Sequence, residues 1–252
     1  YLKLRKYHIA IKNLDIGIKL NPNNLIGFLN RGFAFEKLGK FANAISDANK
    51  VIEINKNFFI AYTNKGNALK AMKRFKEAIL NYEIAIKLNP KFAPAYYNKA
   101  ITLGELNQWD EAINFYNKSI SLNYNVEISY WNKSLLYLLK GDLEKGFLFY
   151  EWRWKREKFF SKIKNIQQPF WRGNFSIKNK TILIHAEQGR GDIIQFSRYI
   201  DLVQKEGSKV IAQFPKSLIN LMKGLRGEFK TISNEEKEAL KKLASFIGKP
   251  DD

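Results

Sequence analysis

Residues 59–92 read FIAYTNKGNALKAMKRFKEAILNYEIAIKLNPKF, and this stretch sets the pattern for most of the chain. The same residue types return 34 residues earlier and 34 residues later. Residues of one type recur at the same position of each repeat, and we call each such set a column. The aromatic column is Phe28, Tyr62, Tyr96 and Tyr130, and the asparagine column is Asn21, Asn55, Asn89 and Asn123. Two columns hold small residues, and these are Gly32, Gly66, Ala100 and Ser134, and Ala44, Ala78, Ala112 and Gly146. A fixed period of this length predicts a stack of similar supersecondary units.

The columns indicate what each unit is. Small residues predict places where two antiparallel helices cross closely, because a larger side chain would push the backbones apart. One helical hairpin cannot bury its own apolar face, so neighbouring hairpins must stack into a continuous core. The sequence predicts full repeats at 25–58, 59–92 and 93–126, a partial repeat at 1–24 and a divergent one at 127–158.

This pattern resembles the tetratricopeptide repeat (TPR), which forms α-solenoids of helical hairpins. The resemblance covers residues 1–158 and implies that the first helix of each hairpin lines a concave groove for a protein or peptide partner. Tyr1 falls near the end of a first helix. We therefore expect the chain to be a piece of a longer protein.

One polar column is not needed for packing. We call it the asparagine ladder, and it consists of Asn30, Asn64, Asn98 and Asn132. A basic residue follows each member, giving a basic column of Arg31, Lys65, Lys99 and Lys133. An asparagine amide has a donor and an acceptor, so it can pair with a peptide backbone of any sequence, and basic neighbours would favour acidic or phosphorylated segments. The alternative is that asparagine simply suits a solvated helix face in this asparagine-rich chain. The ladder resembles the one in the TPR superhelix of O-GlcNAc transferases.

The period is lost after Tyr150, and residues 159–179 are expected to form a connector. Short apolar runs then alternate with helical patterns, which predicts a parallel sheet of the α/β class. The expected strands are 181–186, 210–214 and 229–232, and the expected helices are 193–205, 216–223 and 235–246. Aromatic residues expected where the two parts dock are Trp152, Trp154, Phe159 and Phe160. Residues 180–252 are thus predicted to be a partial, Rossmann-like α/β domain.

A glycine turn, Gly189-Arg190-Gly191-Asp192, separates the first expected strand from its helix. Ligands of open α/β sheets bind at such strand ends, and exposed amides at a helix start favour anions. The longer string from Ile184 to Tyr199, IHAEQGRGDIIQFSRY, resembles the region that follows the repeats in bacterial TPR proteins with a heptosyltransferase-like glycosyltransferase domain. That domain is also similar, more distantly, to O-GlcNAc transferases.

The resemblance implies a GT-B fold, with this part as the acceptor-side half of the catalytic domain. Asp192 would be the catalytic base that takes the proton of the acceptor hydroxyl, and Gly189, Arg190 and Gly191 would lie near the acceptor or a phosphate. A nucleotide-sugar donor is implied for the full-length enzyme, whereas this chain, which holds no cofactor and lacks the donor half, should be inactive alone. Asp192 could instead cap its helix together with Gln195. For the whole chain, the alternative is a non-catalytic TPR adaptor.

Composition narrows the classes of partner. The chain has 43 Lys and Arg against 24 Asp and Glu, a net charge of +19. This balance suits an acidic partner, but the basic residues are scattered singly, and the aromatic residues fall in packing columns rather than in a stacking platform for nucleic acid. The absence of cysteine excludes disulfides and thiolate metal sites and fits a reducing compartment such as the cytoplasm. We expect no metal site, no membrane span and no nucleic-acid partner.

Overall fold

The computed structural model describes residue 2 and residues 6–155, 171, 175–185, 189–224 and 230–233 of the 252-residue chain. The chain divides into two compact units, Tyr1–Gln167 and Gln168–Asp252.

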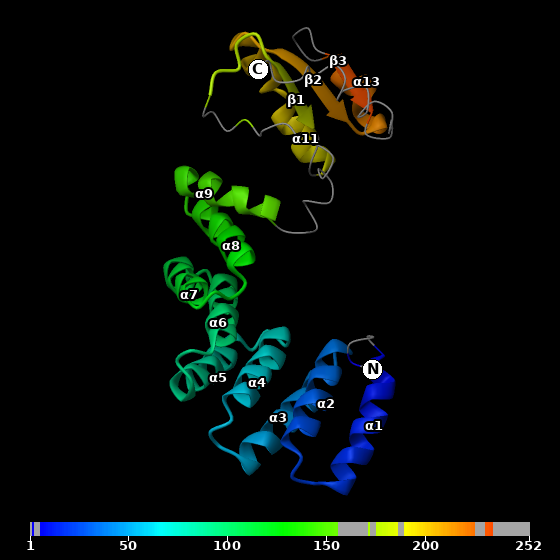
Figure 1. The fold of residues 1–252 in the computed structure, drawn as a ribbon, viewed down its shortest axis with the longest axis vertical. Coiled ribbons are helices and arrows are strands. Elements are labelled where there is room, and N and C mark those ends of the chain that lie inside the picture. Colours follow the sequence, from blue (N-terminus) through cyan, green and yellow to red (C-terminus); the bar gives the residue numbers. More distant parts are fainter. Residues whose placement is uncertain are drawn as a thin grey trace, which may run out of the picture. The chain divides into compact units, whose positions relative to one another are not determined.

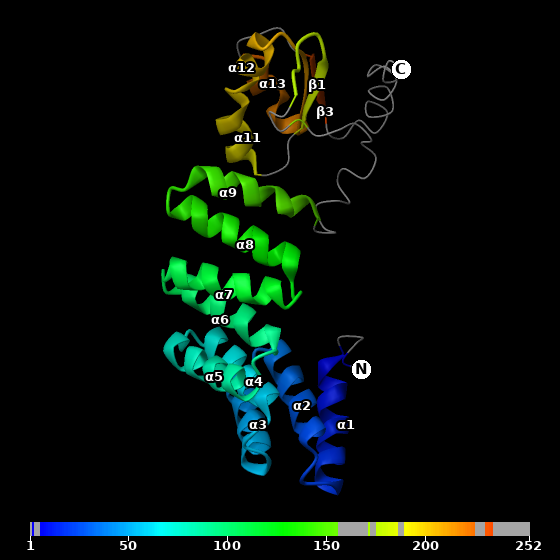
Figure 2. The ribbon, with the colours of Figure 1, turned by 60° about the vertical axis from the view of Figure 1, so that its left-hand side comes forward.

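The first unit is a stack of helical hairpins, coloured blue to green in order along the chain in Figure 1. Its helices are α1 (Tyr7–Leu20), α2 (Leu25–Lys37), α3 (Phe41–Ile54), α4 (Phe59–Ala71), α5 (Phe75–Leu88), α6 (Ala93–Glu105), α7 (Trp109–Ser121), α8 (Val126–Leu139) and α9 (Leu143–Tyr150). The pairs α2/α3, α4/α5, α6/α7 and α8/α9 are hairpins, and α1 stands where a second helix is expected. The predicted all-helical repeat stack is therefore confirmed, and Figure 2 shows it from a second side.

The loops repeat as regularly as the helices. The side chains of Asn21, Asn55 and Asn89 each accept a hydrogen bond from the backbone N–H two residues later, at 3.1, 2.9 and 3.0 Å. Asparagine favours this local turn, which explains its presence at the start of these three inter-repeat loops. Within each hairpin, the turn holds one residue with φ between 59° and 81°, at Gly39, Lys73, Asn107 and Gly141. A left-handed residue at this place ends the first helix and lets the chain reverse.

The small-residue columns mark close helix crossings, as predicted. Ala78 and Ala112 are fully buried. A Cβ atom added to Gly66 would stand 2.6 Å from Cε1 of Tyr82, whose side chain is fully buried in the same hairpin. A Cβ atom at Gly146 would stand 2.5 Å from Cδ2 of Leu138. The neighbouring helix therefore limits the size of the side chain at these positions.

This close contact predicts opposite effects for two glycine substitutions. Gly66→Ala should lower the free energy of unfolding by about 1–2 kcal/mol, because overpacking against Tyr82 outweighs the helix propensity of alanine. Gly17→Ala in α1 should raise it by about 0.5–1 kcal/mol, because no atom lies within 4 Å of the added methyl group. Urea unfolding of both variants tests this pair. Equal stabilisation by both would show that Tyr82 does not constrain the crossing.

A short 3₁₀ helix, η1 (Glu151–Lys155), closes the last hairpin. It contacts both α8 and α9. The ring of Trp152 stacks on Tyr130 with centroids 4.2 Å apart, and Nζ of Lys155 lies 3.8 Å from the Trp152 ring centroid. Trp152, expected at the junction of the two parts, thus packs on α8. Phe159 and Phe160 lie outside the described residues.

The second unit contains a parallel sheet with strand order β1-β2-β3. Its elements are β1 (Thr181–His185), α11 (Arg190–Ser197), α12 (Ile200–Lys205), β2 (Lys209–Phe214), η2 (Lys216–Leu218), α13 (Ile219–Met222) and β3 (Lys230–Ser233). Apolar side chains from one strand and the adjoining helices form its core, which contains Ile193, Ile200, Val210, Ala212, Phe214, Leu218 and Met222. A parallel α/β unit was predicted, but three strands in sequential order do not establish the Rossmann-like arrangement.

The prediction of one continuous helix at 193–205 was wrong in detail, because the two helices α11 and α12 occupy this stretch. Ser197 donates its hydroxyl to the carbonyl oxygen of Ile194 at 2.8 Å, and the helix ends there. Serine competes with the backbone for such bonds and disfavours helix interiors. The helix expected at 235–246 lies outside the described residues.

Candidate peptide-binding face

The asparagine ladder lies on four successive first helices. Asn30, Asn64 and Asn98 are each the sixth residue of α2, α4 and α6, and Asn132 follows on α8. The first helices also pack against one another, α2 against α4 and α4 against α6. This contact brings Asn30, Asn64 and Asn98 onto one continuous face, and all four side chains of the ladder are half-buried.

The ladder retains open hydrogen-bonding capacity. Asn132 donates Nδ2 to the hydroxyl of Tyr116 at 3.1 Å, and Oδ1 of Asn98 accepts from Nζ of Lys70 at 3.4 Å. Among the described residues, the side chains of Asn30 and Asn64 form no hydrogen bond. Since neither amide is cut off from solvent, both can pair with a ligand.

Apolar side chains flank the ladder on the same helices. The position three residues after each asparagine is apolar on α2, α6 and α8, where it holds Phe33, Ile101 and Leu135, and polar on α4, where it holds Asn67. Phe33 is 40% exposed, and Ile26, one turn before Asn30, is 58% exposed. The face thus combines amides with exposed apolar surface, a composition that suits an extended polypeptide segment.

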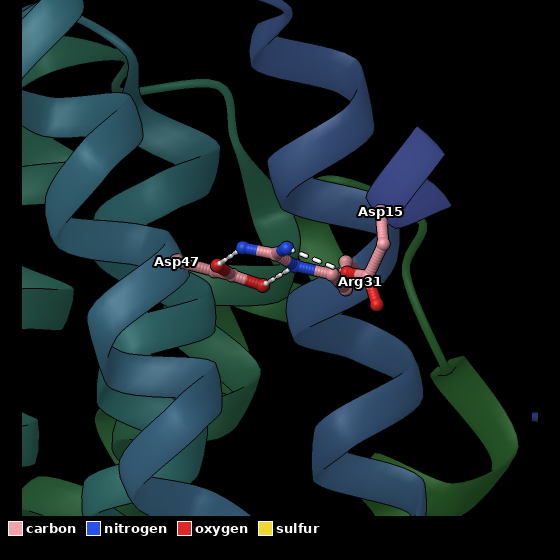
Figure 3. Close-up of polar contacts among 3 residues, drawn as sticks. All are labelled: Asp15, Arg31 and Asp47. Carbon is pink, nitrogen blue, oxygen red and sulfur yellow. Dashed lines mark hydrogen bonds and ion pairs between the residues drawn. The ribbon is translucent and has the colours of Figure 1, made fainter. Parts of the chain in front are cut away.

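The basic column behaves differently from the ladder, as Arg31 shows (Figure 3). Its guanidinium donates to both carboxylate oxygens of Asp47 on α3, at 2.6 and 2.9 Å, and to Asp15 on α1 at 2.7 Å. The hydrogen bond with Asp47 raises the pKa of Arg31, which therefore stays charged. Burial raises the pKa of Asp47, and Arg31 opposes that rise. Arg31 thus joins its own hairpin to the preceding helix.

Lys99 and Lys133 are also engaged inside the stack, and each is only 5% exposed. Nζ of Lys99 bonds Glu83 at 2.7 Å and lies 4.1 Å from the Phe115 ring centroid. Nζ of Lys133 bonds Oδ1 of Asn117 at 2.5 Å, and burial lowers its pKa. Lys65 is half-buried.

The sequence carried a signal for this arrangement that we missed. The residues 16 positions before each member of the basic column are Asp15, Asn49, Glu83 and Asn117, another polar column with the 34-residue period. Arg31, Lys99 and Lys133 all contact their member of it. This pairing leaves little reason to expect that these three cations select acidic segments.

In the second unit, the turn before α11 does not use Asp192 as its helix cap. Gly189 is the N-cap of α11, and Asp192 lies inside the first turn, so the expectation that Asp192 caps this helix was wrong. A carboxylate there still interacts favourably with the helix dipole. Gly189, Arg190, Gly191 and Asp192 are all exposed, whereas Glu187 and Gln188 lie outside the described residues. The catalytic role of Asp192 and the acceptor role of its neighbours stay predictions.

Within the described part of the chain, no helix is long and apolar enough to cross a bilayer. The same residues contain no group of three His, Asp or Glu side chains placed to hold a metal ion.

Comparisons with known proteins agree with the hairpin stack. Sequence profiles of the tetratricopeptide repeat match residues 1–57, 59–92 and 81–114. A search of curated proteins finds no match. The profile matches support a TPR interaction protein better than the transferase, since none of them is to a glycosyltransferase domain.

Solved structures also resemble the hairpin stack. A crystal structure of MamA is 26% identical, with a TM-score of 0.54 over 62% of this chain and 91% of that one. The TPR protein TTC0263 of Thermus thermophilus is 17% identical, with a TM-score of 0.55 over 65% of this chain and 89% of that one, and shows the fold alone. Repeat profiles, hairpin geometry and these structures concur that the chain is a tetratricopeptide-repeat protein.

Proposed function

We propose that the solenoid is a protein-interaction module that holds an extended polypeptide segment along its first-helix face. Tetratricopeptide repeats present extended concave surfaces to protein partners. The observation that carries the proposal is the asparagine ladder, which places one amide on each of four successive first helices. Each amide can donate to a backbone carbonyl and accept from a backbone N–H, so recognition does not depend on the side chains of the ligand.

The apolar positions beside the ladder add affinity. Ile26 and Phe33 expose apolar surface next to Asn30, and a bound segment would cover it. Burial of apolar area stabilises a complex by about 25 cal/mol per Å². We therefore expect ligands that are extended, with apolar side chains interspersed between backbone contacts, rather than strongly acidic ones.

The proposal predicts a loss of affinity when the central ladder is removed. Peptides selected from a random display library against the whole chain should bind the Asn64→Ala/Asn98→Ala variant about tenfold to a hundredfold more weakly, because two hydrogen bonds to the ligand backbone are lost. Fluorescence anisotropy with a labelled selected peptide measures this.

A matched control replaces Asn81 and Asn114, on the second helices α5 and α7, by Ala. Those side chains belong to second helices, so binding should stay unchanged. Equal affinity of the ladder variant and the wild-type protein would reject the ladder as the binding site.

A further inference from the structure

The end of α11 and the outer side of α12 carry large apolar side chains that are exposed. Phe196 and Leu202 are each 53% exposed, and Tyr199 is 43% exposed. The rings of Phe196 and Tyr199 stack with centroids 6.1 Å apart, and Leu202 lies about one helical turn further along the chain. We call these three residues the apolar patch. The core of this unit takes Ile193 and Ile200 from the same two helices, so the apolar patch is additional surface that this core does not use.

A group of lysines borders the carboxyl end of α12. Lys205 belongs to the last turn of this helix, and Lys178 packs beside Gly207, where an added Cβ atom would stand 3.1 Å from Cγ of Lys178. The backbone N–H of Lys209 donates to the carbonyl oxygen of Lys180 at 2.8 Å, so these two residues are also neighbours. All four lysines are exposed, and we call them the lysine cluster.

The positive charge at this place is largely unmatched. Lys205 pairs with Asp201 at 2.7 Å, whereas the other three members of the lysine cluster form no ion pair with a described residue. Over residues 175–185 and 189–224, eight Lys and Arg stand against three Asp and Glu. The lysine cluster is therefore available to a negatively charged partner.

An apolar patch beside unmatched cations favours an anionic membrane surface as that partner. Exposed apolar side chains can insert shallowly into the interface of a bilayer while neighbouring cations meet anionic headgroups. Tyr199 suits this interface, because its ring is apolar and its hydroxyl group is polar. Arg198 adds a cation at the same place, with its guanidinium carbon 4.9 Å from the centroid of the Tyr199 ring. A lipid surface accommodates both kinds of group without a shape that matches the helix ends.

We propose that the second unit binds the surface of an anionic membrane through the apolar patch and the lysine cluster. The side chains of Phe196, Tyr199 and Leu202 enter the headgroup region, and the lysines contact the lipid phosphates. This mode of binding is peripheral and requires no spanning helix. It is independent of the proposed function, because it uses no residue of the hairpin stack.

A dye attached to the apolar patch reports insertion directly. The chain contains no cysteine, so one introduced cysteine can carry an environment-sensitive dye such as nitrobenzoxadiazole. The whole chain labelled at Leu202→Cys should brighten on vesicles of phosphatidylcholine and phosphatidylglycerol, because the dye leaves water, and should not respond to phosphatidylcholine alone. The control is the chain labelled at Leu80→Cys, which replaces a leucine that is 58% exposed in the hairpin stack. Its dye should respond to neither kind of vesicle.

Co-sedimentation with the same vesicles separates the two parts of the surface. The double variant Phe196→Ser/Leu202→Ser should bind the anionic vesicles about tenfold more weakly, because less apolar area is buried. The triple variant Lys178→Gln/Lys180→Gln/Lys209→Gln should bind them about a hundredfold more weakly, because three cations near the headgroups are lost. All five side chains are exposed, so both variants should fold.

A second triple variant tests whether the position of the charges matters. It replaces Lys76, Lys87 and Lys91, three exposed lysines of the hairpin stack, by Gln and makes the same change in net charge. It should bind nearly as well as the wild-type protein. Equal losses in the two triple variants would show that binding follows net charge alone and would reject the lysine cluster.

Two further results would overturn the inference. If the wild-type chain does not sediment with anionic vesicles at low salt, the membrane is rejected and the surface is left to a protein partner. If the chain sediments but the dye at Leu202→Cys does not respond and Phe196→Ser/Leu202→Ser binds like the wild type, the apolar patch does not insert. The wild-type measurement does not depend on how any variant folds.

Discussion

Replacing Arg31 by Met should lower the free energy of unfolding by about 2–4 kcal/mol, because a largely buried carboxylate then loses its cation. The Asp47 side chain is 4% exposed and accepts two hydrogen bonds from Arg31. Methionine keeps most of the apolar length of the side chain. The loss of stability therefore measures the contribution of the charge and the hydrogen bonds of Arg31. Urea unfolding at neutral pH measures it.

The free energy of unfolding of Arg31→Met should also depend on pH, and it should rise as the pH falls. Burial already raises the pKa of Asp47 above its unfolded value, and removing Arg31 raises it further. A carboxyl group with a raised folded-state pKa favours folding when protonated, so stability should recover as the pH falls from neutral toward that pKa. Asp15→Asn is the control, since Asp15 is 43% exposed and should cost less than about 1 kcal/mol. Similar losses in the two variants, or a loss in Arg31→Met that does not shrink at acidic pH, would contradict this account of the cluster.

Replacing Tyr82 by Ala should cost about 3–5 kcal/mol, the range for deleting a fully buried aromatic ring. The ring packs with Leu69 and Ala78 in the core of the α4/α5 hairpin, and its hydroxyl donates to Oδ1 of Asn67 at 3.0 Å. The void would lie beside Gly66, because the three atoms nearest a Cβ at that position all belong to the Tyr82 ring.

Tyr82→Phe separates packing from hydrogen bonding. It keeps the ring and removes only the hydroxyl, so it should cost about 1 kcal/mol. Urea unfolding of both variants gives the comparison. If Tyr82→Ala cost no more than Tyr82→Phe, the ring would not carry the packing of this hairpin.

The repeat could be predicted from sequence because its determinants are local and recur. A small residue such as Ala78, an aromatic such as Tyr96 and a turn-forming Asn89 each act within one hairpin or its loop, and the fixed period reinforces the signal. The position of the asparagine ladder on the first helices followed from the same period. Bounds of the strands β1 to β3 were also close, since short apolar runs are distinctive.

The orientation of the basic column could not be predicted in the same way. Whether Lys99 faces a ligand or Glu83 depends on how the second helix of the preceding hairpin packs, which is a tertiary feature. The break after Ser197 likewise depends on one side chain bonding a nearby carbonyl. The resemblance to glycosyltransferases rested on a single turn and its flanks, and such a motif carries less weight than several periodic columns.

The proposed function requires a partner segment that lies along the first-helix face. Site-specific photo-crosslinking tests it most directly, with benzoylphenylalanine at Ile101, beside Asn98 on α6, or at Leu80, which is 58% exposed on the second helix α5. We predict that a selected peptide crosslinks to the chain labelled at Ile101 and not to the chain labelled at Leu80. Crosslinking from Leu80 with none from Ile101 would contradict the account and place the partner on the second helices.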